Sequence, residues 1–283
     1  MDNAMVAAAT LLSVGAAILG MSAWRGTNSK PCHDPSASAV LITGGSRGIG
    51  RAAADYLISR GYSVLVTVRK QSQYDEMIDE AERSESKTPY PIFLDVTQDE
   101  HVPTAMIQLK SFLEKHDKQL VALVNNAGIN PEGDKIAEIF DKGENLPNAL
   151  ADPSVGIRIF ETNVIGVGRV TKAVLPLLPK GGRIINIGSY FGSVAGRLEL
   201  DHCYYEASKF ALEGMTNNMR VSLKREGIEV VLIKPGNIDT DMNRRGGEVS
   251  ADVVSRDVER AIASPDPKAR YYPGRVKGMS TKL

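Results

Sequence analysis

The segment AVLITGGSRGIG, residues 39–50, carries the three signals that decide the fold. It begins with the apolar run Ala39–Ile42, which has the length of a buried strand. The glycine-rich turn Thr43–Gly50 follows, and an apolar helical pattern continues through Ile58. Glycines let a pyrophosphate approach the backbone N–H groups at the positive end of a helix. A strand, a glycine turn and a helix in this order therefore predict a dinucleotide-binding unit of an α/β fold.

A second marked segment, YYEASK at residues 204–209, opens a helical pattern that extends to about Arg225. Residues four apart share one side of a helix, so Tyr205 and Lys209 are expected side by side. A free phenol has a pKa of about 10, and an adjacent cation favours the phenolate and brings that pKa toward neutrality. Such a pair can act as a general acid or base. Because Tyr and Lys at this spacing also occur by chance on exposed helices, the inference depends on the glycine turn upstream.

The composition excludes several classes of protein. The 283 residues are 42% hydrophobic and 24% charged, which is typical of one large globular α/β domain with an appendage. A net charge of zero gives no electrostatic footprint for nucleic acid. Cys32 and Cys203 are too few for a disulfide framework and lack metal-ligand spacing. The sequence therefore predicts no metal site, and a reducing compartment is the simpler interpretation.

Several motifs in a fixed order resemble the short-chain dehydrogenase/reductase family. The family's Thr-Gly-x-x-x-Gly-x-Gly motif stands at Thr43–Gly50, and its Asn-Asn-Ala-Gly motif stands at Asn125–Gly128. The similarity extends from about Ala39 to Gly274. It implies a single Rossmann-type domain, with helices on both sides of a doubly wound parallel sheet, and a nicotinamide cofactor. It also implies a catalytic tetrad, which maps onto Asn163, Ser189, Tyr205 and Lys209.

The resemblance gives each member of the tetrad a role. Tyr205 exchanges a proton with the substrate oxygen, and Lys209 lowers the tyrosine pKa and bonds the nicotinamide ribose. Ser189 follows the apolar strand Arg183–Ile187 and holds the substrate oxygen, although a serine there also commonly caps a turn. Asn163 stands mid-helix, where asparagine is locally unfavourable. It is expected to bend the helix and hold a water that relays protons from Lys209, with polar filler as the alternative.

The cofactor is expected at the carboxyl ends of the strands, where ligands bind in open α/β sheets. The resemblance places Asp95 against the adenine amino group, while the alternative is that Asp95 or Thr97 caps the next helix. It places the Pro235–Gly236 turn beside the nicotinamide carboxamide. The expected cofactor-binding set is Thr43, Gly44, Ser46, Arg47, Gly48, Ile49, Gly50, Arg69, Asp95, Val96, Asn126, Ala127, Gly128, Tyr205, Lys209, Pro235, Gly236, Ile238 and Thr240.

The end of the second expected strand, Tyr62–Val68, indicates which nicotinamide cofactor is used. Enzymes that prefer NAD usually place an acidic residue there, but this chain has Arg69 and Lys70. Arg47 adds a cation inside the glycine turn. A guanidinium pairs bidentately with phosphate, so the two arginines favour NADP(H), with NAD(H) less favoured. The alternative is that Arg69 only begins a solvated turn.

Two features concern the surroundings of the site. Residues 129–160 are longer and more polar than the family usually shows, and we interpret them as a surface insertion, with substrate or partner contact as the alternative. The helix that begins at Tyr205 has more apolar residues than one buried side needs. Some of them could form the helix-to-helix contact by which the family commonly makes dimers. A homo-oligomer, either dimer or tetramer, is therefore expected.

The first thirty residues form the appendage. Ala4–Trp24 carries no charge and is just long enough to span a bilayer as a helix. The basic residues Arg25 and Lys30 follow it, which predicts a cytosolic catalytic domain. We expect a membrane-anchor or targeting segment at residues 1–27, a linker at 28–38 and the NADP-binding domain at 39–283. An anchor in an endoplasmic-reticulum-like membrane is favoured over a cleaved peptide that directs a soluble protein to an organelle, and over a soluble tail.

The expected activity is reversible NADP(H)-dependent hydride transfer between a carbonyl and a secondary or primary alcohol. Residues 205–214 and 270–274 resemble the retinol and hydroxysteroid dehydrogenase branch of the family, and an anchor would suit a substrate that partitions into bilayers. A lipophilic alcohol or ketone, such as a steroid or retinoid, is therefore expected. The alternatives are a 3-oxoacyl thioester reductase of lipid synthesis and, more remotely, a non-catalytic NADP-sensing binding protein.

Overall fold

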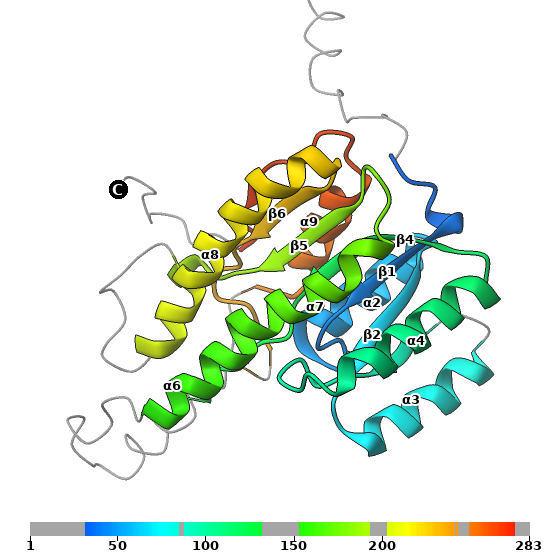
Figure 1. The fold of residues 1–283 in the computed structure, drawn as a ribbon, viewed down its shortest axis with the longest axis horizontal. Coiled ribbons are helices and arrows are strands. Elements are labelled where there is room, and N and C mark those ends of the chain that lie inside the picture. Colours follow the sequence, from blue (N-terminus) through cyan, green and yellow to red (C-terminus); the bar gives the residue numbers. More distant parts are fainter. Residues whose placement is uncertain are drawn as a thin grey trace, which may run out of the picture. The chain divides into compact units, whose positions relative to one another are not determined.

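The computed structural model describes residues 32–84, 88–131, 153–192, 203–240, 242 and 249–274. Across these residues seven parallel strands form one sheet in the order β3-β2-β1-β4-β5-β6-β7 (Figure 1). The strands are β1 (Ser38–Ile42), β2 (Ser63–Val68), β3 (Tyr90–Phe93), β4 (Gln119–Asn125), β5 (Arg183–Ile187), β6 (Glu229–Ile233) and β7 (Arg270–Tyr271). The strand order reverses between β1 and β4, which is the switch point of a doubly wound sheet. The predicted Rossmann-type sheet is confirmed.

Helices cover both sides of this sheet. Figure 1 shows α4, α7 and α8 in front of the strands and α2 and α9 behind them. Side chains of β1 alternate between the two layers: Ala39 and Leu41 pack with α4 and α7, whereas Val40 and Ile42 pack with α2 and α9. The α-helices are α2 (Gly48–Ser59), α3 (Gln71–Arg83), α4 (His101–Lys115), α6 (Pro153–Phe160), α7 (Gly166–Val174), α8 (Cys203–Leu223) and α9 (Asp252–Ala263). Because both sides are covered, every β1 residue is buried, which explains the continuous apolar run in the sequence.

The predicted boundaries agree best for the buried strands. The predicted strand Arg183–Ile187 is confirmed residue for residue as β5. Helix α8, which contains the YYEASK segment near its start, ends two residues before the expected Arg225. A 3₁₀ turn follows, and Gly227 ends it with a left-handed φ of 74°.

Two predictions concern segments that the structure describes only in part or not at all. The predicted N-terminal hydrophobic helix, within residues 4–24, lies outside the described residues. None of the helices that the structure describes is long and apolar enough to cross a bilayer. The expected insertion at 129–160 ends earlier than predicted, because its last eight residues form α6. Helix α6 packs against α8 through Gly156, where an added Cβ would lie 2.8 Å from the Tyr204 ring.

Candidate active site

The glycine turn has the backbone that a pyrophosphate cradle requires. Gly44 and Gly48 have φ values of 66° and 59°, which side-chain-bearing residues rarely adopt. A Cβ at Gly45 would lie 2.4 Å from Val66, and one at Gly50 would lie 2.4 Å from the Asn126 side chain. Helix α2 starts directly at Gly48, so its first N–H groups and its positive end belong to this turn. The local structure therefore fits a dinucleotide phosphate.

Thr43 and Asn126 lock this turn to the end of β4. The Thr43 hydroxyl oxygen accepts hydrogen bonds from the backbone N–H groups of Asn126 and Ala127, each at 3.0 Å. The Asn126 amide nitrogen donates to the carbonyl oxygens of Thr43 at 3.0 Å and Gly44 at 2.9 Å. Both side chains were expected in the cofactor-binding set. Their polar atoms bond the protein itself, so they shape the cradle that the glycines line.

The expected 2′-phosphate residues lie at adjoining positions. Gly44 donates its N–H to the Thr67 hydroxyl at 3.0 Å, so the end of β2 lies against the glycine turn. Arg69 follows β2, and Arg47 immediately precedes α2. Both arginines are exposed. Two exposed cations at this edge of the sheet suit a phosphate better than a ribose hydroxyl.

On the adenine side, Asp95 closes a local turn. One carboxylate oxygen of Asp95 accepts from the Thr97 backbone N–H at 2.9 Å and from the Thr97 hydroxyl at 2.8 Å. The Asp95 N–H donates to Nδ1 of His101, at the start of α4, at 3.2 Å. The alternative, in which Asp95 or Thr97 caps the next helix, is therefore wrong, because Glu100 occupies the N-cap position of α4. Sequence reasoning missed His101, because no motif marks it.

Val96 packs in the hydrophobic core, and its backbone bonds a residue near the expected catalytic asparagine. Its side chain is 6% exposed and packs in the layer below α4 and α7. Its carbonyl oxygen accepts from Arg169 of α7 at 2.6 Å, and Arg169 also bonds Glu161 at 2.8 Å. Glu161 begins the turn that carries Asn163. Arg169 therefore ties the adenine-side loop to the catalytic region, and sequence reasoning missed it.

Tyr205 and Lys209 meet Ser189 at the carboxyl end of β5. The Tyr205 and Ser189 side chains are hydrogen-bonded. The Lys209 ammonium lies 5.6 Å from the centre of the Tyr205 ring and donates to the Ile187 carbonyl oxygen at 3.1 Å. Tyr205 of α8 thus contacts both Ser189, two residues after β5, and Lys209 of the same helix.

The protonation of this pair departs from the expectation. Burial raises the pKa of Tyr205 to about 12, and the bond from Ser189 opposes that rise without cancelling it. Burial also lowers the pKa of Lys209 to about 8. Lys209 was expected to bring the tyrosine pKa down, but desolvation is the larger effect in the protein alone. Tyr205 is partly buried. Its phenol is therefore protonated at neutral pH and poised to donate.

Asn163 lies in a single π-helical turn, Glu161–Ile165, between α6 and α7. This turn interrupts the α-helix at the position where the bend was predicted, and such turns frequently mark functional sites. The side chain is 1% exposed. Its oxygen accepts from the Ile129 N–H at 2.9 Å, and its nitrogen donates to the Ile129 carbonyl at 3.1 Å and to the Ser208 hydroxyl at 3.1 Å. Ser208 in turn donates to the Tyr205 carbonyl at 2.7 Å, a link that the sequence did not reveal.

Gly128 is the point where these groups converge. A Cβ at Gly128 would lie 3.3 Å from the Asn163 carbonyl oxygen and 3.7 Å from the Lys209 nitrogen. The absence of a side chain there leaves the asparagine oxygen and the ammonium close to one another. This arrangement suits the expected proton relay, in which a water would bond both groups.

The turn after β6 lies at the same edge of the sheet as Tyr190 and the glycine turn. Pro235 accepts at its carbonyl oxygen from the Tyr190 N–H at 2.8 Å, and Gly236 donates its N–H to the Pro273 carbonyl at 3.0 Å. Thr240 lies across the glycine turn, since a Cβ at Gly48 would lie 3.7 Å from its side chain. Among the expected cofactor residues, the Ile49 and Ile238 side chains pack into the core on the α2 side. Their side chains therefore also contribute to the hydrophobic core.

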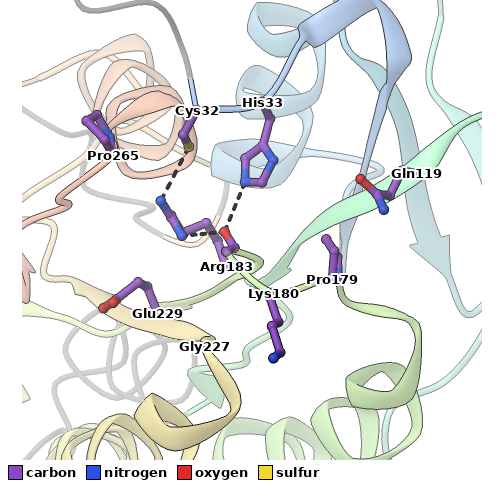
Figure 2. Close-up of a pocket in the computed structure, with 10 residues that line it drawn as sticks. Cys32, His33, Gln119, Pro179, Lys180, Arg183, Gly227, Glu229 and Pro265 are labelled. Atoms are coloured by element: carbon purple, nitrogen blue, oxygen red, sulfur yellow. Dashed lines mark hydrogen bonds between the residues drawn. The ribbon is translucent and has the colours of Figure 1, made fainter.

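A pocket lies at the opposite edge of the sheet, where β4, β5 and β6 begin (Figure 2). It measures about 430 Å³. Arg183 of β5 is 2% exposed there and donates to the carbonyl oxygens of Ala261 at 3.2 Å and Ser264 at 2.8 Å, and to the Cys32 sulfur at 3.3 Å. His33 bonds the Gly181 carbonyl at 3.0 Å. These bonds attach residues 32 and 33 to the segment 181–183, at the edge of the sheet opposite the expected cofactor turn.

Known proteins share this sequence pattern and this fold. Residues 38–249 match the family described as short chain dehydrogenase. The chain is 32% identical over 253 residues to mitochondrial D-beta-hydroxybutyrate dehydrogenase of Bos taurus, covering 88% of this chain and 69% of that protein. It is 28% identical over 279 residues to estradiol 17-beta-dehydrogenase 2 of Mus musculus, covering 84% of this chain and 68% of that protein.

A solved structure shares the fold over most of its length. It is a short chain dehydrogenase from Burkholderia cenocepacia J2315 in complex with NADP. The identity is 25% and the TM-score is 0.69, with 86% of this chain and 98% of that chain covered.

Proposed function

The chain belongs to the short-chain dehydrogenase/reductase family and is an oxidoreductase acting on CH–OH groups, and on that premise we propose that it transfers hydride reversibly between NADP(H) and a lipophilic carbonyl or alcohol. The observation that carries the proposal is the contact of Tyr205 with Ser189 beside Lys209, at the carboxyl edge of the sheet. A nicotinamide bound there supplies or accepts the hydride.

The residues of this chain supply the proton and its path. In the reductive direction the Tyr205 phenol donates its proton to the substrate oxygen, which Ser189 holds by a hydrogen bond. Lys209, close to the phenol, stabilises the phenolate that remains. Asn163 bonds the Ile129 backbone and the Ser208 hydroxyl, and its carbonyl oxygen together with Lys209 would hold the relay water. Tyr205 regains its proton along this path.

The preference for NADP(H) rests on Arg47 and Arg69. We expect Arg69→Ala to weaken NADPH binding by about 10- to 100-fold, because a hydrogen bond to a charged group contributes about 1.5–3 kcal/mol. NADH affinity should change less than about twofold, since NADH lacks the 2′-phosphate. The measurement is fluorescence titration of both nucleotides.

Arg51→Ala is the matched control for the NADPH prediction. Arg51 lies in the first turn of α2, four residues after Arg47, but its side chain pairs with Asp55 at 2.9 Å. Its loss should leave both nucleotide affinities unchanged. An Arg69→Ala chain that binds NADPH as tightly as the parent chain would remove the basis for the preference.

The substrate class is the finer part of the proposal. The resemblance of residues 205–214 to the hydroxysteroid branch supports a steroid- or retinoid-like substrate, and estradiol 17-beta-dehydrogenase 2 is among the relatives. The uncharged run at 4–24 supports attachment to a membrane, where such substrates concentrate. The similarity to D-beta-hydroxybutyrate dehydrogenase favours a second candidate, a short hydroxy acid.

The experiment is NADPH oxidation by the full chain with estrone, retinal, acetoacetate and an acetoacetyl thioester, using Tyr205→Phe as the blank. Turnover confined to estrone or retinal supports the lipophilic class. Turnover confined to acetoacetate establishes the hydroxy acid, and turnover confined to the thioester establishes the 3-oxoacyl reductase alternative. Tyr205-independent oxidation in every case would contradict the mechanism.

We further propose that the chain forms a homodimer through α8. Phe210 is 40% exposed and Val221 is 75% exposed. Gly214 lies between them, and a Cβ there would meet no atom within 4 Å. The three positions share one side of the helix. An apolar strip around a glycine lets a second helix approach closely.

The dimer is tested by Gly214→Arg, which we expect to convert a wild-type dimer to a monomer in light scattering after gel filtration. A buried guanidinium without a partner would oppose the contact. Ile107→Glu is the control, because Ile107 is 65% exposed on α4 and lies outside the strip. A wild-type monomer, or a Gly214→Arg chain with unchanged mass, would contradict the proposal.

A further inference from the structure

Lys234 is a buried cation with no part in the proposed proton path. It follows the last residue of β6 and directly precedes the Pro235–Gly236 turn. Its side chain is only 1% exposed, and its ammonium forms an ion pair with Glu213 of α8. Lysine is almost never fully buried unless it is paired, because removing an ammonium from water is costly. Lys234 directly precedes the turn that is expected to contact the nicotinamide, so this costly burial occurs next to the proposed cofactor site.

Glu213 connects Lys234 to the last strand as well. Its second carboxylate oxygen accepts from Nε of Arg270, on β7, at 3.0 Å. Arg270 also donates to Asn217, one turn further along α8, at 2.9 Å. The Lys234 backbone N–H donates to the Tyr271 carbonyl at 2.9 Å. The carboxylate would therefore keep one cation if Lys234 lost its charge, whereas Lys234 would keep none of its ion pair if Glu213 were removed.

The same helix carries Glu213 and the catalytic pair. Glu213 lies four residues after Lys209 and eight after Tyr205, which is about two helical turns, or about 12 Å of helix. The Lys234 side chain therefore spans from the start of the Pro235–Gly236 turn to the helix that holds the proton donor. The backbone bonds of that turn reach Tyr190 and Pro273 instead.

We propose that Lys234 is a positioning residue that sets the separation between the Pro235–Gly236 turn and the Tyr205–Lys209 pair. It thereby holds the nicotinamide half of the cofactor in register with the proton donor. This inference rests on the proposed cofactor placement. The expected phosphate and adenine contacts come mainly from the ends of β1, β2, β3 and β4, whereas the ion pair and backbone bond of Lys234 reach α8 and β7. Its loss should therefore weaken binding of the nicotinamide half alone.

The test compares two ligands by titration calorimetry on the full chain. NADPH contains the nicotinamide, and 2′-phospho-ADP-ribose lacks it. Lys234→Met keeps the aliphatic stem and removes the charge. We expect it to weaken NADPH binding about tenfold and to change 2′-phospho-ADP-ribose binding less than twofold. Arg270→Met is the matched control, since it removes the other cation of Glu213, and it should change both affinities less than twofold.

The outcomes separate this inference from the proposed function. A parent chain that binds neither ligand contradicts the cofactor proposal itself. The positioning role would be overturned if Lys234→Met weakened binding of both ligands equally or of neither. It would also be overturned if Arg270→Met weakened NADPH binding as selectively as Lys234→Met. Equal affinity of the parent chain for the two ligands would overturn it as well, because the nicotinamide half would then have no held site.

A second variant guards against misfolding. If Lys234→Met lacks the far-ultraviolet circular dichroism of the parent chain, Glu213→Asp is measured instead. It keeps every charge and withdraws the carboxylate by one methylene, so the same selective loss of NADPH affinity is expected. Failure of both variants to fold would overturn the inference, because the ion pair would then serve the fold rather than the turn.

Discussion

Tyr205→Phe will give a folded chain that binds NADPH normally and turns over about 10³-fold more slowly than the parent chain. The substitution removes only the hydroxyl that donates the proton and that bonds Ser189. Because the group acts on the transition state, kcat and kcat/KM should fall together while the cofactor affinity is retained. Steady-state kinetics on the most active ketone of the substrate panel, with NADPH fluorescence titration, measures both quantities.

Tyr204→Phe is the control for this prediction. Tyr204 precedes Tyr205 on α8, and its ring packs against Gly156 of α6. Its loss of a hydroxyl should leave kcat within about twofold. Equal rates for the Tyr205→Phe chain and the parent chain would show that another group supplies the proton. Equal losses in the two variants would indicate damage to the start of α8 rather than loss of an acid.

Gly50→Ala will weaken NADPH binding by about 100-fold, which corresponds to about 2.8 kcal/mol. The added Cβ would lie 2.4 Å from the Asn126 nitrogen and 2.5 Å from the Gly44 carbonyl oxygen. Either contact forces the glycine turn away from the end of β4 and strains the bonds from Asn126. Overpacking of this kind also destabilises a fold by about 1–3 kcal/mol, so the melting temperature should fall as well.

Gly168→Ala separates the effect of crowding from the effect of losing a glycine. Gly168 lies inside α7, and a Cβ there would meet no atom within 4 Å. Alanine in a helix interior is about 0.5–1 kcal/mol more favourable than glycine, so this variant should melt slightly higher and bind NADPH normally. An undiminished NADPH affinity in Gly50→Ala would mean that the glycine turn does not hold the phosphates.

The sequence predicts most of the fold because the sheet is parallel. Its strands are buried on both sides, so β5 and β6 appear as short apolar runs with clear ends. The helix ends were less predictable. Helix α8 stops at Leu223, because a tighter turn and the left-handed Gly227 follow, and the apolar pattern does not distinguish that turn from another helical one.

The candidate site was predictable in its members but not in its energetics. The spacing of Tyr205 and Lys209 fixes their contact, since both stand on one helix. Their protonation depends on how much protein surrounds them, which no local pattern encodes, and burial gave the tyrosine the opposite pKa shift from the one expected. Ser208, Arg169 and Lys234 were missed for a related reason. Each of them has a partner 20 or more residues away in the sequence.

The fastening of residue 32 by Arg183 has a practical consequence for attaching the protein to a solid support. Cys32 and Cys203 are the two cysteines of the chain, and both are exposed. Cys203 begins the helix that carries Tyr205 two residues later, whereas Cys32 lies at the edge where the strands start. A thiol-reactive electrode would therefore capture the parent chain in two orientations, one of them with the catalytic helix against the metal. With Cys203→Ser, coupling through Cys32 would present the catalytic edge uniformly to the solution.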